Sequence, residues 1–104
     1  SKPFFGEPSY NSDYLDLLMD TQSKKIFSLL IKEIMNLSLI DELQVKEILS
    51  NISSAFNIKG KDLFFPIRLS IWGDIHGPDI ALIIKILGKE KTLDRLNRAL
   101  NYGK

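Results

Sequence analysis

Apolar side chains in this chain recur every three or four residues, and no stretch alternates at every second residue as a half-exposed β-strand does. From Ile26 to Met35 this spacing places the apolar side chains on one helical face, and a similar stripe runs from Val45 to Phe56. Stop residues such as Asn57 and Gly88 separate the periodic stretches. The pattern predicts an all-α protein, a compact bundle of five to six short helices with no sheet.

Capping and breaking residues predict where these helices begin and end. Asp41 followed by Gln44 resembles a capping box. Pro66 lacks an amide hydrogen and clashes with the preceding turn, so its helix either begins at Pro66 or kinks there. Pro78 is expected at the first position of a helix that is apolar almost all round, and therefore buried at the centre. Ser12 or Asp13 can cap a short helix that runs to about Asp20, and Thr21 or Ser23 can start the next helix. The later helices are expected behind Asp41, within 61–72, from Pro78 to Gly88, and from about Lys89 to Asn101.

The composition bounds the class of protein. A chain of 104 residues with 44% apolar and 26% charged residues is long enough for one globular domain with a modest core. It has no cysteine and a single histidine, His76, which excludes disulfides, zinc–thiolate sites and multi-histidine metal sites. No apolar run approaches the roughly 20 residues that span a bilayer. We expect a cytoplasmic monomer with no membrane partner.

The beginning of the chain suggests that it is part of a longer protein. It opens Ser1-Lys2-Pro3 with neither a methionine nor a secretion signal, and we expect a fragment. Residues 1–11 contain two prolines and a glycine with no clear periodicity, and they are expected to be a lead-in from a preceding subdomain. Residues 12–104 are then the helical domain.

The charge is divided unequally along the chain. Residues 1–57 carry five lysines against eight acidic residues, a net charge of −3, and residues 58–104 carry nine basic against five acidic residues, a net charge of +4. A basic half is one property of proteins that bind polyanions, although a surplus of this size also arises by chance.

Three residues of the 61–72 helix form the most specific candidate site. Phe65, Arg68 and Trp72 are spaced three and four residues apart, so they share a helical face with a guanidinium between two aromatic rings. Surfaces of this kind bind single-stranded nucleic acids, because the rings stack on bases and arginine supplies charge and directed donors. The alternative is that both aromatic residues belong to the core and the Arg68 stem lies along Trp72.

Two weaker signals lie nearby. Lys91, Arg95 and Arg98 form a basic stripe opposite the leucines of the last helix, which either holds phosphates or is only the solvated face of an amphipathic helix. Gly77-Pro78 precedes a helix whose first amides have no partner within the helix, so it is either a site for a phosphate or base edge or an ordinary helix start.

The sequence contains no catalytic constellation. It lacks a glycine-rich phosphate loop and a Gly-x-Ser-x-Gly elbow, and it has no cysteine or second histidine for nucleophilic catalysis. We therefore expect no catalytic residues, no metal site and no cofactor in this chain.

The part of the chain from Lys59 to Leu100 resembles the C-terminal end of bacterial glutamyl-tRNA synthetases. The matching pieces agree with that family in order and spacing over about 40 residues. They are Phe65-Pro66-Ile67-Arg68, Gly73, Gly77-Pro78, Leu87-Gly88-Lys89-Glu90 and Arg95-Leu96-Asn97-Arg98-Ala99-Leu100.

The resemblance implies the helical-cage fold of class I synthetase anticodon-binding domains and a role in binding the anticodon loop of glutamate tRNA. The parent enzyme would join glutamate to tRNA with ATP and magnesium, which act outside this chain. In the family, Arg68 corresponds to an arginine that contacts anticodon bases, and the turn before the apolar helix contributes a residue pair. The anticodon-binding residues that the resemblance implies are Phe65, Arg68, Gly77, Pro78 and Ile80, with Trp72 as a local addition.

Two other functions fit the same sequence. A helical protein–protein interaction module with no RNA role requires an exposed apolar groove, which Leu82 and Ile86 could line. A small stand-alone protein that uses the same fold on another RNA is the third possibility.

Overall fold

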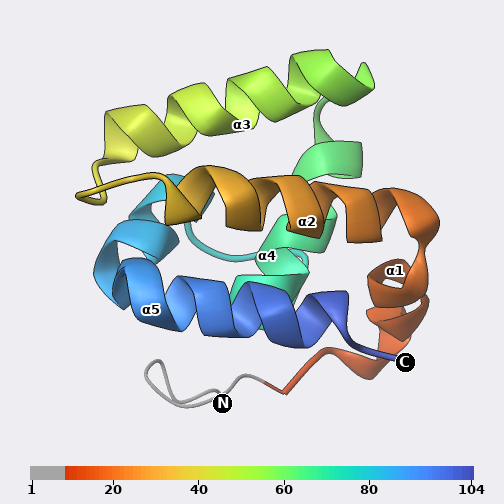
Figure 1. Cartoon of the computed structure of the whole chain (residues 1–104). Helices are drawn as coiled ribbons and strands as arrows, with labels where there is room; N and C mark the ends of the chain where they lie inside the picture. Colours follow the sequence, from red (N-terminus) through yellow and green to blue (C-terminus); the bar gives the residue numbers. More distant parts are fainter. Residues whose placement is uncertain (1–8) are drawn as a thin grey trace.

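The computed structural model describes residues 9–104 and is all-helical, with no strand among those residues (Figure 1). The fold class predicted from apolar spacing is confirmed. Residues 1–8, which make up most of the predicted lead-in, lie outside the described residues. The elements are η1 (Ser12–Tyr14), α1 (Leu15–Met19), α2 (Thr21–Met35), α3 (Glu42–Phe56), α4 (Lys61–Trp72) and α5 (Ile80–Leu100).

Helix α5 consists of two helical segments that meet at Gly88. Gly88 has φ 83° and ψ 172°, which no α-helix accommodates and which glycine adopts without a steric penalty. The predicted helix end at Gly88 is therefore confirmed, and α5 turns at this residue as it passes the other helices (Figure 1).

The core lies where α5 packs against α2, α3 and α4, while α3 lies along the outer side of α2 (Figure 1). Most of the core consists of leucine and isoleucine side chains, each of which stabilises the fold by about 1.5–3 kcal/mol when fully buried. The fully buried side chains include Phe27, Leu30 and Ile34 of α2, Ile52 of α3, Ile67, Leu69 and Ile71 of α4, and Ile83 and Ile84 of α5.

Several helix ends were predicted correctly in position but not in detail. Asn57 ends α3 in the left-handed conformation with φ 54°. Asp41 precedes α3 as expected, but its side chain makes no capping hydrogen bond, so the predicted capping box is wrong. Helix α4 begins at Lys61 and continues through Pro66, which excludes a start at the proline.

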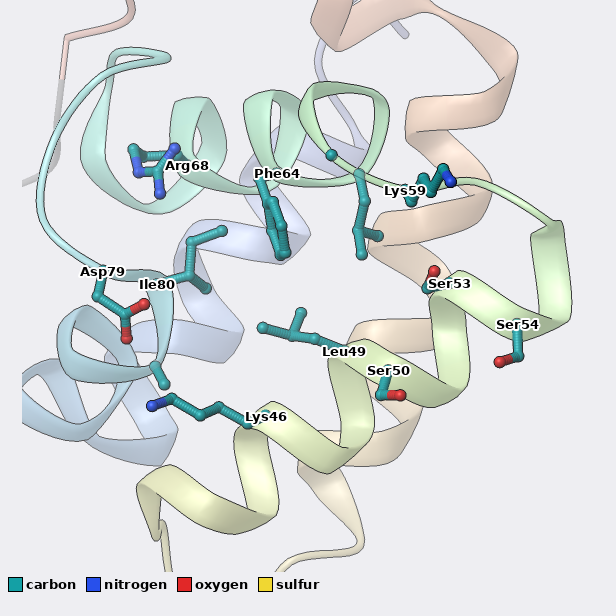
Figure 2. A pocket seen from close by; sticks show the side chains of 13 residues that line it. Lys46, Leu49, Ser50, Ser53, Ser54, Lys59, Phe64, Arg68, Asp79 and Ile80 are labelled. Carbon is teal, nitrogen blue, oxygen red and sulfur yellow. The ribbon is translucent and has the colours of Figure 1, made fainter.

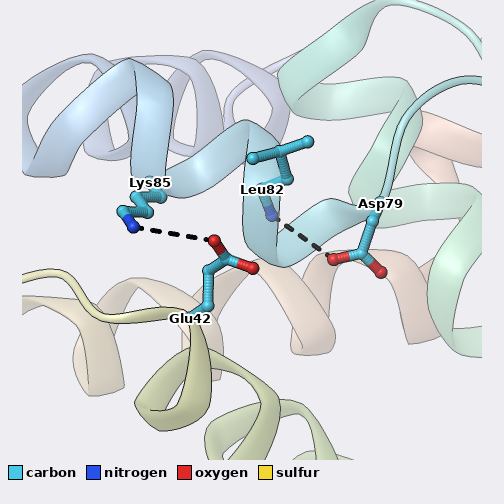
Figure 3. A network of polar contacts seen from close by, with 4 residues as sticks. All are labelled: Glu42, Asp79, Leu82 and Lys85. Carbon is cyan, nitrogen blue, oxygen red and sulfur yellow. Dashed lines mark hydrogen bonds and ion pairs between the residues drawn. The ribbon is translucent and has the colours of Figure 1, made fainter.

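The start of α5 also differs from the prediction. Pro78 is not the first helical residue, because Asp79 follows it as the N-cap and its Oδ2 accepts a hydrogen bond from Leu82 N at 3.4 Å (Figure 3). Aspartate at this position satisfies one of the amides that a helix leaves unpaired at its first turn.

The first segment of α5 is not buried on all sides, so that prediction is wrong. Leu82 and Ile86 are 40% and 50% exposed. Lys85, on the same exposed side, forms an ion pair with Glu42 at the start of α3, with Nζ and Oε1 3.7 Å apart (Figure 3). Both partners are solvent-exposed, so the pair contributes at most about 1 kcal/mol.

Two lysines close helix ends that lie far away in the sequence. Lys24 Nζ of α2 donates to Ala99 O at 2.8 Å and to Tyr102 O at 2.7 Å, at the end of α5. Lys89 Nζ of α5 donates to Met35 O at 3.0 Å and to Leu37 O at 2.7 Å, at the end of α2. Ala99 O also accepts a hydrogen bond from Tyr102 N at 3.2 Å. Carbonyls at the end of a helix lack some of their donors, so each lysine adds a donor there and joins α2 to α5.

Candidate nucleic-acid interface

The loop 73–79 joins α4 to α5 and lies against one face of α4. Gly73 ends α4 with φ 96°, and its amide donates to Leu69 O at 2.9 Å, which turns the chain back over the helix. Asn11 fixes the start of the loop, because its amide N donates to Gly73 O at 2.8 Å and its Nδ2 donates to Asp74 Oδ1 at 3.2 Å. Ile75 anchors the loop in the core, whereas residues 76–79 are exposed.

Arg68 holds this loop by two hydrogen bonds. Its Nε donates to Pro78 O and its Nη1 donates to Ile75 O, both at 3.0 Å. A guanidinium carries five N–H donors in a fixed planar fork, so two of its three nitrogens are engaged here. Its Nη2 makes no hydrogen bond to any residue from 9 to 104.

Phe65 and Trp72 contact the same loop on either side of Arg68. The Phe65 ring meets the His76 ring edge to face, with centroids 5.8 Å apart. The Trp72 indole lies against Gly77 so closely that a Cβ on Gly77 would come within 2.5 Å of Trp72 Nε1. Phe65 and Trp72 are half-buried, and Trp72 also packs against the edge of the core. The structure therefore places these three side chains on one face, as predicted.

Not every predicted site residue is accessible. Gly77 and Pro78 are exposed on the loop, but Ile80 is only 2% exposed and packs in the core, so its side chain offers no surface to a base in this structure. The first turn of α5 is also occupied, because the carboxylate of Asp79 lies at its amides. An added phosphate would meet that negative charge, so the predicted phosphate site at this helix start is not formed.

The predicted basic stripe on the second segment of α5 is wrong as a continuous surface. Lys91 is exposed, but Arg95 is only 5% exposed and its Nη1 donates to Ile71 O at 2.8 Å. Arg98 is half-buried, with its guanidinium carbon 5.3 Å from the centre of the Tyr10 ring. The carbonyls near the end of α4 need donors, and Arg95 supplies one from the neighbouring helix.

A groove between α3 and α4, hereafter the α3–α4 groove, was not predicted from the sequence (Figure 2). It encloses about 460 Å³ and reaches the start of α5. Helical spacing places Phe64 on the same face of α4 as the buried Ile67 and Ile71, but Phe64 is 36% exposed and lines this groove. The polar and charged lining residues are Lys46, Ser50, Ser53, Ser54, Lys59, Arg68 and Asp79.

A second hollow of about 530 Å³ lies on the other side of α4, next to α1. Hereafter it is the acidic hollow, because its lining includes four aspartates but only one lysine, Lys61. No group of three histidine, cysteine, aspartate or glutamate side chains within residues 9–104 is arranged to hold a metal ion. Phe65 lines this hollow, and its aspartates are Asp13, Asp16, Asp20 and Asp62.

Comparison with known protein families identifies the family of this domain. The model of the family described as "Anticodon binding domain" matches residues 1–100. The chain belongs to this anticodon-binding domain family. The loop 73–79 and the α4 face beneath it are therefore a candidate interface in a domain of a tRNA-binding family. Separately, none of the helices among residues 9–104 has the length and apolar character needed to cross a bilayer.

Individual relatives agree with this assignment. The anticodon-binding chain is 31% identical over 102 residues to glutamate–tRNA ligase 2 of Caldanaerobacter subterraneus subsp. tengcongensis, covering 97% of the chain and 21% of that protein. It is 33% identical over 101 residues to the glutamate–tRNA ligase of Geobacillus stearothermophilus, covering 96% of the chain and 21% of that protein. The chain thus spans about a fifth of the length of these relatives, and its predicted resemblance to glutamyl-tRNA synthetases is confirmed.

A solved structure shares the same architecture. The glutamate tRNA ligase from Elizabethkingia meningosepticum, solved in complex with its amino acid, superposes with a TM-score of 0.85 at 25% sequence identity. The match covers 97% of this chain and 20% of that one. The whole helical bundle of the anticodon-binding domain is therefore shared.

Proposed function

We infer that this domain binds the anticodon loop of a glutamate-accepting tRNA as part of a glutamyl-tRNA synthetase. Its membership of the anticodon-binding family and its likeness to glutamate–tRNA ligases support this function. The synthetase would attach glutamate to the tRNA with ATP and magnesium bound in its other domains. We further propose that it acts in the cytoplasm and that this domain is monomeric.

The observation that carries the proposal is the position of the Arg68 guanidinium. Two of its nitrogens hold the loop at Ile75 O and Pro78 O, and Nη2 makes no hydrogen bond within residues 9–104. Because the fork is planar and fixed, the two engaged nitrogens orient the third. An arginine oriented in this way can donate to a base edge without first losing conformational entropy.

The loop around Arg68 offers surfaces for bases. His76, Gly77 and Pro78 are exposed, so a ring or a backbone amide can meet an unstacked base there. Trp72 lies beneath Gly77 and supports the loop from below. Ile80, buried at the start of α5, fixes the end of the loop by packing in the core.

The proposal is tested by measuring how tightly the domain binds a glutamate-tRNA anticodon stem-loop, with fluorescence anisotropy as the readout. Replacing Arg68 with alanine removes the base contact and both loop hydrogen bonds, and we expect about a 10- to 100-fold loss of affinity, since one specific arginine contact contributes about 1–3 kcal/mol. Lys32→Ala, an exposed lysine of α2, is the control for a lost positive charge and should change affinity less than threefold. Equal affinities of wild type and Arg68→Ala would contradict the proposal.

The protein–protein interaction module remains a second candidate, because Leu82 and Ile86 are exposed as it requires. Replacing both with serine distinguishes the two functions. If the domain binds the anticodon loop, this variant should bind the stem-loop as tightly as wild type, because neither residue lies on the loop 73–79 or on the α4 face beneath it.

A further inference from the structure

The α3–α4 groove has the size and lining of a nucleotide site beside the proposed anticodon interface. Its volume of about 460 Å³ falls within the roughly 300–1,000 Å³ that is typical of ligand sites. Arg68 lines the groove and also holds the loop 73–79, so the two surfaces meet at this residue. An RNA strand that reaches Arg68 from the loop can therefore continue into the groove without leaving the protein.

The groove is lined by three basic side chains, Lys46, Lys59 and Arg68, and by one acidic side chain, so its lining is net positive. Lys46 and Lys59 line it and are exposed, and neither forms an ion pair with any residue from 9 to 104. Lys46 extends from α3 toward the start of α5, and Lys59 lies at the opposite end of the groove, where the chain enters α4 (Figure 2). Asp79 is the one acidic lining residue, and its carboxylate accepts a hydrogen bond from the first turn of α5.

The wall of the groove supplies an aromatic ring. Phe64 projects from α4 toward Leu49 of α3, and it remains 36% exposed although Ile67 and Ile71 on its side of the helix are buried (Figure 2). Lysines around an accessible ring form the combination that holds single-stranded nucleic acids, because the lysines bind the backbone and the ring stacks on a base.

The acidic hollow, which also borders α4, repels the same ligand. The acidic hollow carries Asp13, Asp16, Asp20 and Asp62 against Lys61, so phosphates are disfavoured on the α1 side of the helix. Phe65 lines the acidic hollow and Phe64 lines the groove, which gives adjacent aromatic residues on α4 opposite electrostatic surroundings. The charge distribution therefore selects one direction for an RNA backbone that passes Arg68.

We propose that the α3–α4 groove binds the nucleotide adjoining the anticodon, with Lys46 and Lys59 on its phosphates and Phe64 stacked on its base. This inference rests on the proposed anticodon function and adds the path of the RNA strand. The strand passes from the loop 73–79 over Arg68 and along α3, and it avoids the acidic hollow.

The test is the salt dependence of binding to the glutamate-tRNA anticodon stem-loop. Each phosphate contact to a single strand contributes about 0.7 to the slope of log K against log salt concentration. Lys46→Gln should therefore lower the magnitude of this slope by about 0.7, and Phe64→Ala should weaken binding about tenfold with the slope unchanged. Lys61→Gln is the matched control, because it removes the same charge from an exposed lysine on the acidic side of α4 and should leave the slope unchanged.

The outcomes separate this inference from the proposed function. If Arg68→Ala weakens binding but Lys46→Gln and Phe64→Ala leave affinity and slope at wild-type values, the groove is not on the RNA path and the inference is overturned alone. If Lys46→Gln and Lys61→Gln lower the slope equally, the charge acts only through the general field and the inference is likewise overturned. If the stem-loop does not bind the wild-type domain at all, the proposed function fails, and this inference fails with it.

Discussion

The Trp72 indole and the Gly77 backbone are in such close contact that a Cβ at Gly77 would lie 2.5 Å from Trp72 Nε1. The φ angle of Gly77 is outside the left-handed region, so the position requires glycine because of space and not because of backbone conformation. Trp72 is the last residue of α4, and this contact limits how closely the loop 73–79 can pack against the helix.

Gly77→Ala should displace either the indole or the loop. We expect a loss of about 1–3 kcal/mol in the free energy of unfolding, as for other overpacked sites, together with a shift in the fluorescence of Trp72, the single tryptophan of the chain. Chemical denaturation with fluorescence detection measures both. The double variant Trp72→Leu with Gly77→Ala makes room for the new methyl group. Its loss of unfolding free energy should therefore be smaller than the sum of the losses in the two single variants. Strict additivity of the two changes would contradict the steric account.

Arg68→Lys should behave more like Arg68→Ala than like wild type. Lysine keeps the positive charge, but its ammonium group cannot reproduce the planar fork that reaches Ile75 O and Pro78 O together. We expect affinity for the anticodon stem-loop to fall about tenfold, a loss of about 1.4 kcal/mol, and amide exchange in the loop to accelerate. Wild-type affinity in Arg68→Lys would mean that charge alone matters at this position.

Arg95 should matter for stability and not for RNA binding. It is buried and its Nη1 donates to Ile71 O at 2.8 Å, so replacing it with methionine keeps an apolar stem but removes that donor. We expect a loss of about 1–3 kcal/mol in unfolding free energy, the usual cost of an unsatisfied buried polar group. Folded Arg95→Met should bind the stem-loop within twofold of wild type. A large loss of affinity without a loss of stability would restore Arg95 as a phosphate contact.

Lys24 should contribute to stability in a pH-dependent way. Burial, and secondarily the charge of Lys104, lower the pKa of Lys24 below its usual value of 10.5. Between the lowered pKa and 10.5 the unfolded chain binds more protons at this residue than the folded chain, so the contribution of Lys24 to the free energy of unfolding rises with pH there. Below the lowered pKa both states carry the proton and this contribution is constant.

Lys24→Met tests this contribution. The variant removes the lysine donor from Tyr102 O and from Ala99 O, although Ala99 O keeps its hydrogen bond from Tyr102 N. It should lower the free energy of unfolding by about 1 kcal/mol at pH 7, since these carbonyls are only partly buried. The difference between wild type and variant should grow above neutral pH. A difference that shrinks as pH rises toward 10.5 would show that the charged form is favoured in the folded state.

The helices could be predicted because their signals are local. The apolar spacing in α2 and α3, the left-handed stop at Asn57 and the break at Gly88 each depend on residues within one or two turns. The shared face of Phe65, Arg68 and Trp72 follows from helical geometry in the same way. The contacts of those side chains with the loop 73–79 were not predictable, because the path of the loop over α4 depends on hydrogen bonds from Asn11, which lies about 60 residues away in the sequence.

The errors involve partners that are distant in sequence. Arginine is usually a surface residue. Nothing near Arg95 in the sequence indicates that it would be buried against α4 and donate a hydrogen bond to Ile71 O. Phe64 lies on the apolar side of α4, but the neighbouring helix α3 leaves its ring partly uncovered. The α3–α4 groove depends on how two helices pack, so helical periodicity alone carries no signal for it.

The central claim, that the loop 73–79 and the α4 face beneath it bind anticodon bases, is tested most directly by NMR. Amide spectra of the domain would be recorded during titration with a glutamate-tRNA anticodon stem-loop, and again with its first two anticodon bases exchanged. We predict that shifts concentrate at Phe65, Arg68, His76, Gly77 and Asp79, and that the exchange weakens them. Shifts that spread evenly over exposed lysines and do not respond to the exchange would contradict anticodon recognition by this surface.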